Sequence, residues 1–152
     1  MLSITKTACI VGAATAIILA AAGAAAAQGP SPGKKVFSDY RGVSIGMTAD
    51  DARKKLGEPA DKSDTQDMFN FPGDESASVY YDAAKKVFAV SIMYSGKTAP
   101  VAADILGEPA DTKPDGSLFK MMRFPKAGYF VSFSRTAGAG PVTIIAMQRI
   151  GQ

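Results

Sequence analysis

Apolar and polar residues alternate with period two in three segments of each half of the chain. The segments are 66–71, 77–82 and 87–94 in the first half, and 118–124, 129–134 and 142–150 in the second. Short polar or glycine-containing stretches separate them. This alternation is typical of antiparallel strands with one buried face, so each half of the chain predicts a meander of three strands.

A motif of fourteen residues occurs twice, 50 positions apart. Residues 48–61 (TADDARKKLGEPAD) and 98–111 (TAPVAADILGEPAD) are identical at nine positions, including the whole of LGEPAD. So many identities in so short a window indicate an internal duplication.

The first copy of the motif carries a signal for each end of a short helix. Thr48 is a good N-cap, and Asp51 follows three residues later, as in a capping box. Gly57 suits the left-handed position that ends a helix, and Pro59 prevents continuation. We therefore expect a helix of about two turns between Thr48 and Gly57.

The second copy keeps most of these signals. Thr98 is the predicted N-cap, Gly107 the predicted C-terminal glycine, and Pro109 follows it. Pro100 lies early in the expected first turn, where a missing N–H group has little cost.

Together these patterns predict an α+β fold built from two tandem αβββ repeats. The first repeat covers residues 38–97 and the second 98–152, with short helices packed on one face of antiparallel sheet. Met121 and Met122 are interpreted as core residues. The other face of the sheet would be exposed, and the sequence leaves open whether the repeats share one sheet or form two.

The N-terminal residues have the composition of an export signal. Residues 1–27 contain one charge, Lys6, followed by an alanine-rich apolar stretch and the small residues Ala25–Ala27. We interpret 1–27 as a signal peptide cleaved near Ala27 and 28–37, rich in Pro and Gly, as a flexible leader. The alternative is an uncleaved membrane anchor, since about 20 apolar residues can span a bilayer.

Composition argues against catalysis. The chain has no histidine, and its single cysteine, Cys9, lies in the segment predicted to be removed. Nucleophilic mechanisms that depend on histidine and zinc sites built from Cys and His are therefore excluded. We expect no enzyme activity, no cofactor and no metal. The net charge of +3 is small and spread along the chain, so nucleic acid is not an expected partner.

The densest group of acidic residues is the remaining candidate for oxygen-based chemistry. Asp61, Asp64, Asp67, Asp74 and Glu75 lie close together in sequence. The run lacks the glycine and terminal glutamate of an EF-hand loop, and paired-carboxylate catalysis needs a deep cleft. We interpret the run as a solvated polar loop.

The first repeat resembles the SmpA/BamE-like domains and the similar tandem units of the β-lactamase inhibitory proteins. The resemblance rests on Gly46-Met47-Thr48, the Leu-Gly-Glu-Pro element at 56–59 and the strand hairpin after it, and it covers residues 43–94. The second repeat keeps the Leu-Gly-Glu-Pro element but has Lys97 before its threonine. The chain differs from the inhibitors in having no tryptophan and from the assembly factors in having no well-placed lipid-accepting cysteine.

The resemblance implies an extracytoplasmic protein that acts by binding other proteins. The first family assists outer-membrane protein assembly, and the second inhibits enzymes through a sheet surface. We therefore expect an exported, periplasmic or secreted, protein-binding module that docks a partner on its exposed sheet face. Tyr80, Met93, Arg123 and Phe130 are the candidate contacts, since aromatic residues and arginine often anchor interfaces. The alternative function is a structural scaffold of the cell envelope, held at the membrane by an uncleaved N-terminal segment.

Overall fold

The structure, a computed structural model, describes residues 37–96 and 98–151. The predicted signal peptide (1–27) and all but the last residue of the predicted leader (28–37) lie outside the described residues, so cleavage and anchoring stay predictions. Within the described part of the chain, no helix has the length and apolar character needed to cross a bilayer.

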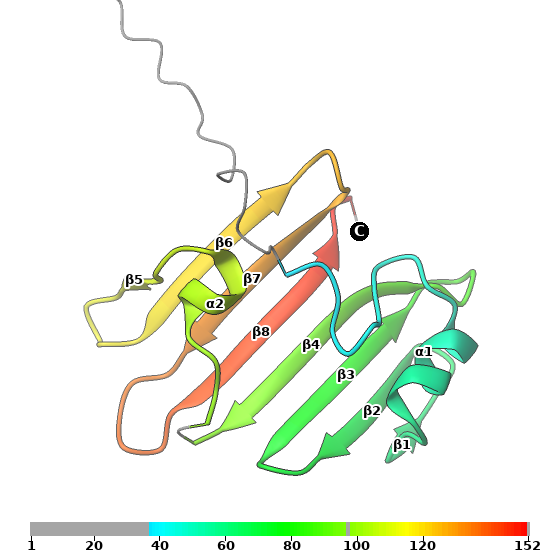
Figure 1. Cartoon of the computed structure of the whole chain (residues 1–152), viewed down its shortest axis with the longest axis horizontal. Helices are drawn as coiled ribbons and strands as arrows, with labels where there is room; N and C mark the ends of the chain where they lie inside the picture. Colours follow the sequence, from blue (N-terminus) through cyan, green and yellow to red (C-terminus); the bar gives the residue numbers. More distant parts are fainter. Residues whose placement is uncertain (1–36, 97, 152) are drawn as a thin grey trace, which may run out of the picture.

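One eight-stranded antiparallel sheet dominates the protein (Figure 1). The elements, in chain order, are α1 (Ala49–Leu56), β1 (Asp61–Lys62), β2 (Gln66–Phe71), β3 (Glu75–Tyr81), β4 (Val87–Ser95), α2 (Ala102–Leu106), β5 (Asp111–Thr112), β6 (Leu118–Phe124), β7 (Tyr129–Arg135) and β8 (Val142–Arg149). Their order across the sheet is β1-β2-β3-β4-β8-β7-β6-β5.

The predicted α+β class, with helices forming a layer over the sheet, is wrong. The two helices are only eight and five residues long, and each buries two small or medium side chains. Each half also has a fourth strand, because β1 and β5 add two-residue pairings outside β2 and β6. The fold is therefore mostly one antiparallel sheet.

Coil contributes as much to the cover of the sheet as the helices do. Residues 37–48 run between α2 and α1 in front of the sheet (Figure 1). Tyr40 and Val43 from this segment are buried among the core side chains, and Phe37, Ile45 and Met47 pack against them. We call this side of the sheet the covered face.

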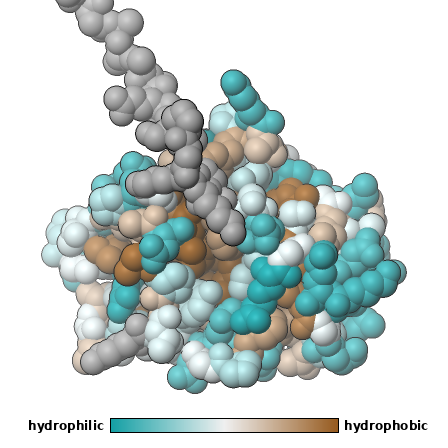
Figure 2. Space-filling view, in the orientation of Figure 1, coloured by the Kyte–Doolittle hydropathy of each residue, from teal (hydrophilic) through white to brown (hydrophobic). Residues whose placement is uncertain are grey.

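The covered face presents a continuous apolar core from both halves. The largest apolar strand side chains that are fully buried are Phe69, Phe133, Ile92, Ile145, Met147, Val79, Val87, Val90 and Val131. In Figure 2, which views this face, polar side chains gather over α1 and apolar ones show near α2. On this side of the protein, polar side chains therefore cover the core mainly over α1.

The cap of α1 is confirmed. The Thr48 hydroxyl accepts a hydrogen bond from the backbone N–H of Asp51 at 3.2 Å and donates to its carboxylate at 2.8 Å. Gly57 ends the helix with φ +91°, a conformation that favours glycine, and Pro59 follows. These contacts explain why the helix stops after two turns.

The cap predicted for the second helix is only partly right. Helix α2 starts at Ala102 with Val101 at the N-cap and no side-chain cap, so Thr98 does not cap it. Pro100 disfavours helical geometry at Ala99, which removes the first turn that the duplicated motif predicts. Gly107 does end the helix, in the left-handed conformation at φ +77°, ahead of Pro109.

A pseudo-twofold relation links the two halves within the single sheet. Strand β4 pairs with β8 over seven residue pairs, and Ser91 lies opposite Ala146, one pair away from the middle of the pairing. The strand registers make these two residues equivalent positions of the repeat, since each pairs outward with a serine, Ser78 or Ser132. The sheet is therefore continuous, with the duplicated halves joined through their last strands.

One buried side-chain polar atom in this core lacks a partner among the residues that the structure describes. Thr143 is fully buried in β8, and its hydroxyl makes no hydrogen bond to any of them. An unpaired buried hydroxyl is destabilising, and valine has nearly the same shape. We expect Thr143→Val to raise the free energy of unfolding by about 1 kcal/mol in urea denaturation. Thr143→Ser keeps the hydroxyl and should show no gain; a gain in both variants would contradict the explanation.

Candidate partner-binding face

The side of the sheet opposite the covered face carries three rows of side chains, and we call it the open face. Strand register places them as Gln66, Tyr80, Ala89, Gln148, Phe130, Arg123; then Met68, Ser78, Ser91, Ala146, Ser132, Met121; then Asn70, Ser76, Met93, Ile144, Ser134, Phe119. Each row crosses six strands. Residues opposite one another in register point to the same side of a sheet.

The open face is unusually apolar for an uncovered surface. Six large apolar side chains are exposed in the described part of the chain, and all but Val101 lie on this face. The five are Met68, Met93, Phe119, Met121 and Ile144, with exposed fractions of 38–45%. Arg123 is the single charged residue among the three rows. An antiparallel sheet face that only contacts water is normally polar, so this face is the candidate binding surface.

The middle row combines small centres with flexible ends. On the four inner strands, β3, β4, β8 and β7, the row consists of small residues: Ser78, Ser91, Ala146 and Ser132. Its two ends, on β2 and β6, are Met68 and Met121. Methionine adapts its shape to different partners, and small side chains allow close approach to the backbone. This arrangement suits contact with another macromolecule.

All four contacts proposed from sequence lie on the open face, but they do not form one cluster. Tyr80 and Phe130 share a row and are separated by Ala89 and Gln148. Arg123 lies next to Phe130, while Met93 lies two rows away. Their positions agree with a common surface, and their contact with a partner stays a prediction.

Sequence reasoning missed the apolar residues that complete this face. Met121 was assigned to the core together with Met122. The structure separates them, with Met121 45% exposed on the open face and Met122 partly buried against the core. The sequence prediction also missed Ile144 and Phe119. Ile144 precedes the buried Ile145, and Phe119 follows Leu118, which packs on the core, so the alternation of each strand assigns both residues to the open face.

A pocket of about 430 Å³ lies at one end of the open face. It is formed where β6, β7 and β8 meet the loops 113–117 and 136–141. Figure 1 shows these two loops at its lower left. Phe119 and Ile144 form apolar parts of its wall, and Lys113 lies beside Phe119. Arg135 also lines the pocket, but its register with Leu118 and Thr143 directs its side chain to the covered face. Its size falls within the range of ligand pockets in proteins.

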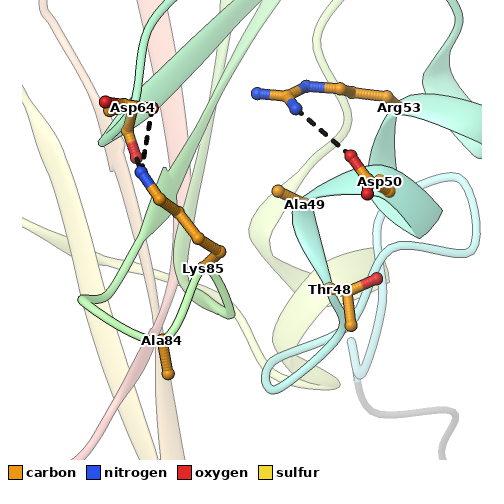
Figure 3. A pocket seen from close by; sticks show the side chains of 7 residues that line it. All are labelled: Thr48, Ala49, Asp50, Arg53, Asp64, Ala84 and Lys85. Atoms are coloured by element: carbon orange, nitrogen blue, oxygen red, sulfur yellow. Dashed lines mark hydrogen bonds and ion pairs between the residues drawn. The ribbon is translucent and has the colours of Figure 1, made fainter.

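A second, polar pocket of about 290 Å³ lies beside the start of α1 (Figure 3). Its cations are already neutralised: Lys85 Nζ lies 2.9 Å from the Asp64 carboxylate, and Arg53 lies 3.4 Å from Asp50. Because the charges pair within the pocket wall, nothing in this arrangement calls for an ionic ligand.

The acidic run near β1 and β2 does not form a site. Asp64 pairs with Lys85, and Asp67 is fully buried against Arg53, which donates to both carboxylate oxygens at 2.7 and 3.1 Å. Tyr81 donates a further hydrogen bond to Asp67 at 2.7 Å. Within residues 37–96 and 98–151, no group of three or more acidic, His or Cys side chains could hold a metal ion.

Comparison with known proteins adds no identification: no family model, curated protein or solved structure matches this chain. The candidate function therefore rests on the sequence and on the geometry of the open face.

Proposed function

We propose that the chain is an exported, non-catalytic module that binds a protein partner through its open face. The observation that carries this proposal is that, of the six large apolar side chains exposed among the described residues, five lie on that face. The resemblance to SmpA/BamE-like and inhibitor domains supports the same function, because both bind partners outside the cytoplasm.

Two substitutions at the centre of one row test the proposal. Met93 and Ile144 lie opposite each other across β4 and β8, and both are exposed. We expect Met93→Asp and Ile144→Asp each to weaken partner capture at least about tenfold, since central apolar contacts dominate interfaces. The measurement is affinity capture from envelope and secreted fractions by the protein isolated from its native source, followed by titration of the recovered partner.

The chain offers a matched control for this experiment. Val101 is 54% exposed and apolar but precedes α2, away from the open face. Val101→Asp should leave capture unchanged, because it adds the same charge elsewhere. Equal loss in all three variants, or no loss in any, would refute binding at the open face. Mass analysis of the native N-terminus accompanies the test: a chain beginning at Met1 would favour the anchored scaffold.

A further inference from the structure

Large and small side chains are matched between the two outer rows of the open face, the rows of Gln66 and Asn70. On three of the four inner strands, a large residue in one outer row lies four positions along the strand from a small residue in the other. The pairs are Tyr80 and Ser76 on β3, Met93 and Ala89 on β4, and Phe130 and Ser134 on β7. The middle row between them is small on all four inner strands.

One half-rotation brings the large and small positions of two copies together. When a second copy is turned about a line along the middle row, each strand lies against the same strand of the other copy, and the outer rows exchange places. Phe130 of one copy then faces Ser134 of the other, and Tyr80 faces Ser76. Sheets packed face to face cross at about 30°, so the opposition is closest on the inner strands. Large residues opposite small ones allow two layers to interdigitate.

The alternative half-rotation, about a line parallel to the strands, packs poorly. It places Tyr80 of one copy against Phe130 of the other, and Ser76 against Ser134. Large side chains then meet large ones, and the facing serines leave a gap in which dispersion contacts are lost. The pattern of sizes therefore favours the first arrangement.

The pocket at one end of the open face lies where the first arrangement needs a hollow. Ser134 lines it, with Phe119 and Ile144 on the strands to either side. The half-rotation brings Phe130 of the second copy to this place. A pocket of about 430 Å³ has room for an aromatic side chain. The open face thus carries both the side chain and the hollow that receives it.

The charge and size of the open face also fit contact between identical subunits. Arg123 is the single charged residue in the three rows, and Lys113 and Asp115 at the pocket have opposite charges. Homodimer interfaces are apolar and depleted of charge at their centre. From the strand and residue spacings, the rows cover about 600 Å² per copy, so two copies would bury about 1,200 Å². This area is at the lower limit for specific interfaces and predicts a reversible dimer.

We propose that the open face is the interface of a homodimer, in which Phe130 of each copy enters the pocket at Ser134 of the other. This goes beyond the proposed function, because the second copy covers the open face until a partner displaces it. The second copy and the partner therefore compete for one surface.

Two complementary variants test this arrangement. Ser134→Phe fills the pocket, and Phe130→Ala removes the side chain that enters it. In sedimentation analysis of the whole protein, each variant alone should dimerise at least about fivefold more weakly than the unaltered protein. The heterodimer of the two variants should form within about threefold of the original affinity. One of its contacts is native, and the other places the new ring opposite alanine.

A control variant and the mixture make the result specific. Val101→Asp adds a charge away from the open face and should leave dimerisation unchanged. The proposal is overturned if the unaltered protein stays monomeric up to about 1 mM. It is also overturned if the mixed variants associate no better than each alone, or if Val101→Asp weakens the dimer as much as Phe130→Ala.

The two proposals fail separately. If partner capture depends on Met93 and Ile144 but mixing the variants restores no dimer, the homodimer is wrong and the proposed function stands. If mixing restores the dimer but no partner depends on Met93 and Ile144, the open face is a dimer interface and the proposed function is wrong.

Discussion

Arg53→Met is expected to lower the free energy of unfolding by about 3 kcal/mol. Asp67 is fully buried and depends on Arg53 for two charge-assisted hydrogen bonds, and the guanidinium group also lies 5.6 Å from the Tyr81 ring. Without the arginine, the carboxylate keeps the Tyr81 hydroxyl but has no cation beside it, and it is left as an uncompensated buried charge. Urea denaturation measures the loss.

A neighbouring cation provides the control for this result. Lys54 belongs to the same helix but is 76% exposed, and its ion pair with Asp51 lies on the surface. Lys54→Met should change stability by less than about 1 kcal/mol. A small effect of Arg53→Met would show that Asp67 is protonated or solvated in the folded protein, contrary to its burial.

The same carboxylate gives this loss a pH dependence. Burial opposes its charge, but the hydrogen bonds from Arg53 and Tyr81 outweigh that cost and hold the pKa of Asp67 below its ordinary value. Its contribution to stability is therefore complete above about pH 4 and disappears as the pH falls through the lowered pKa. Asp67→Asn should flatten the decline of stability between pH 5 and pH 2, and an unchanged slope would rule out this origin.

Ile145→Ala is expected to cost about 2–5 kcal/mol and to destabilise both halves together. Ile145 is 1% exposed and lies opposite the buried Ile92, where β4 and β8 join the repeats. Hydrogen exchange should show lost protection in β2 of the first half and β7 of the second. Because the core runs continuously across the β4·β8 pairing, denaturation should keep a single transition.

The adjacent residue separates core packing from backbone effects. Ile144 occupies the same strand but points to the open face and is 39% exposed. Ile144→Ala removes the same atoms from a solvated position and should cost less than about 1 kcal/mol. Protection lost in the second half alone after Ile145→Ala would show that the repeats unfold independently.

Local patterns in the sequence located most of the strands. Strand β2 has the predicted bounds 66–71, and β6 has the predicted bounds 118–124, because alternation and turn residues act over short distances. The predicted α+β fold class was wrong because alternation within strands does not show what covers the sheet. Tyr40 and Val43 cover the sheet from a segment without periodic pattern, while the helices that do carry clear signals are too short to form a layer.

The features that the sequence did not predict depend on pairing between strands that are distant in the chain. The union of β4 with β8 joins segments some 50 residues apart, and the two-residue strands β1 and β5 leave no signal of their own. For the open face, alternation predicts which residues of one strand share a side. Only the pairing of distant strands shows that Met93 lies opposite Ile144, or that Phe119 borders a pocket. The sequence therefore predicted some residues of the open face but not which of them are neighbours.

The Ser91–Ala146 pairing also suggests how a sheet of two repeats can arise from a dimer of one repeat. A protein made of one repeat would expose the edge of its last strand, and a second copy, turned by a half-rotation, would complete the sheet as it is completed here. In such a dimer both ends of the outer surface would be identical. In the single chain the two ends are free to differ, and they do: one carries Phe119 and Ile144 where the other carries Gln66 and Ala89.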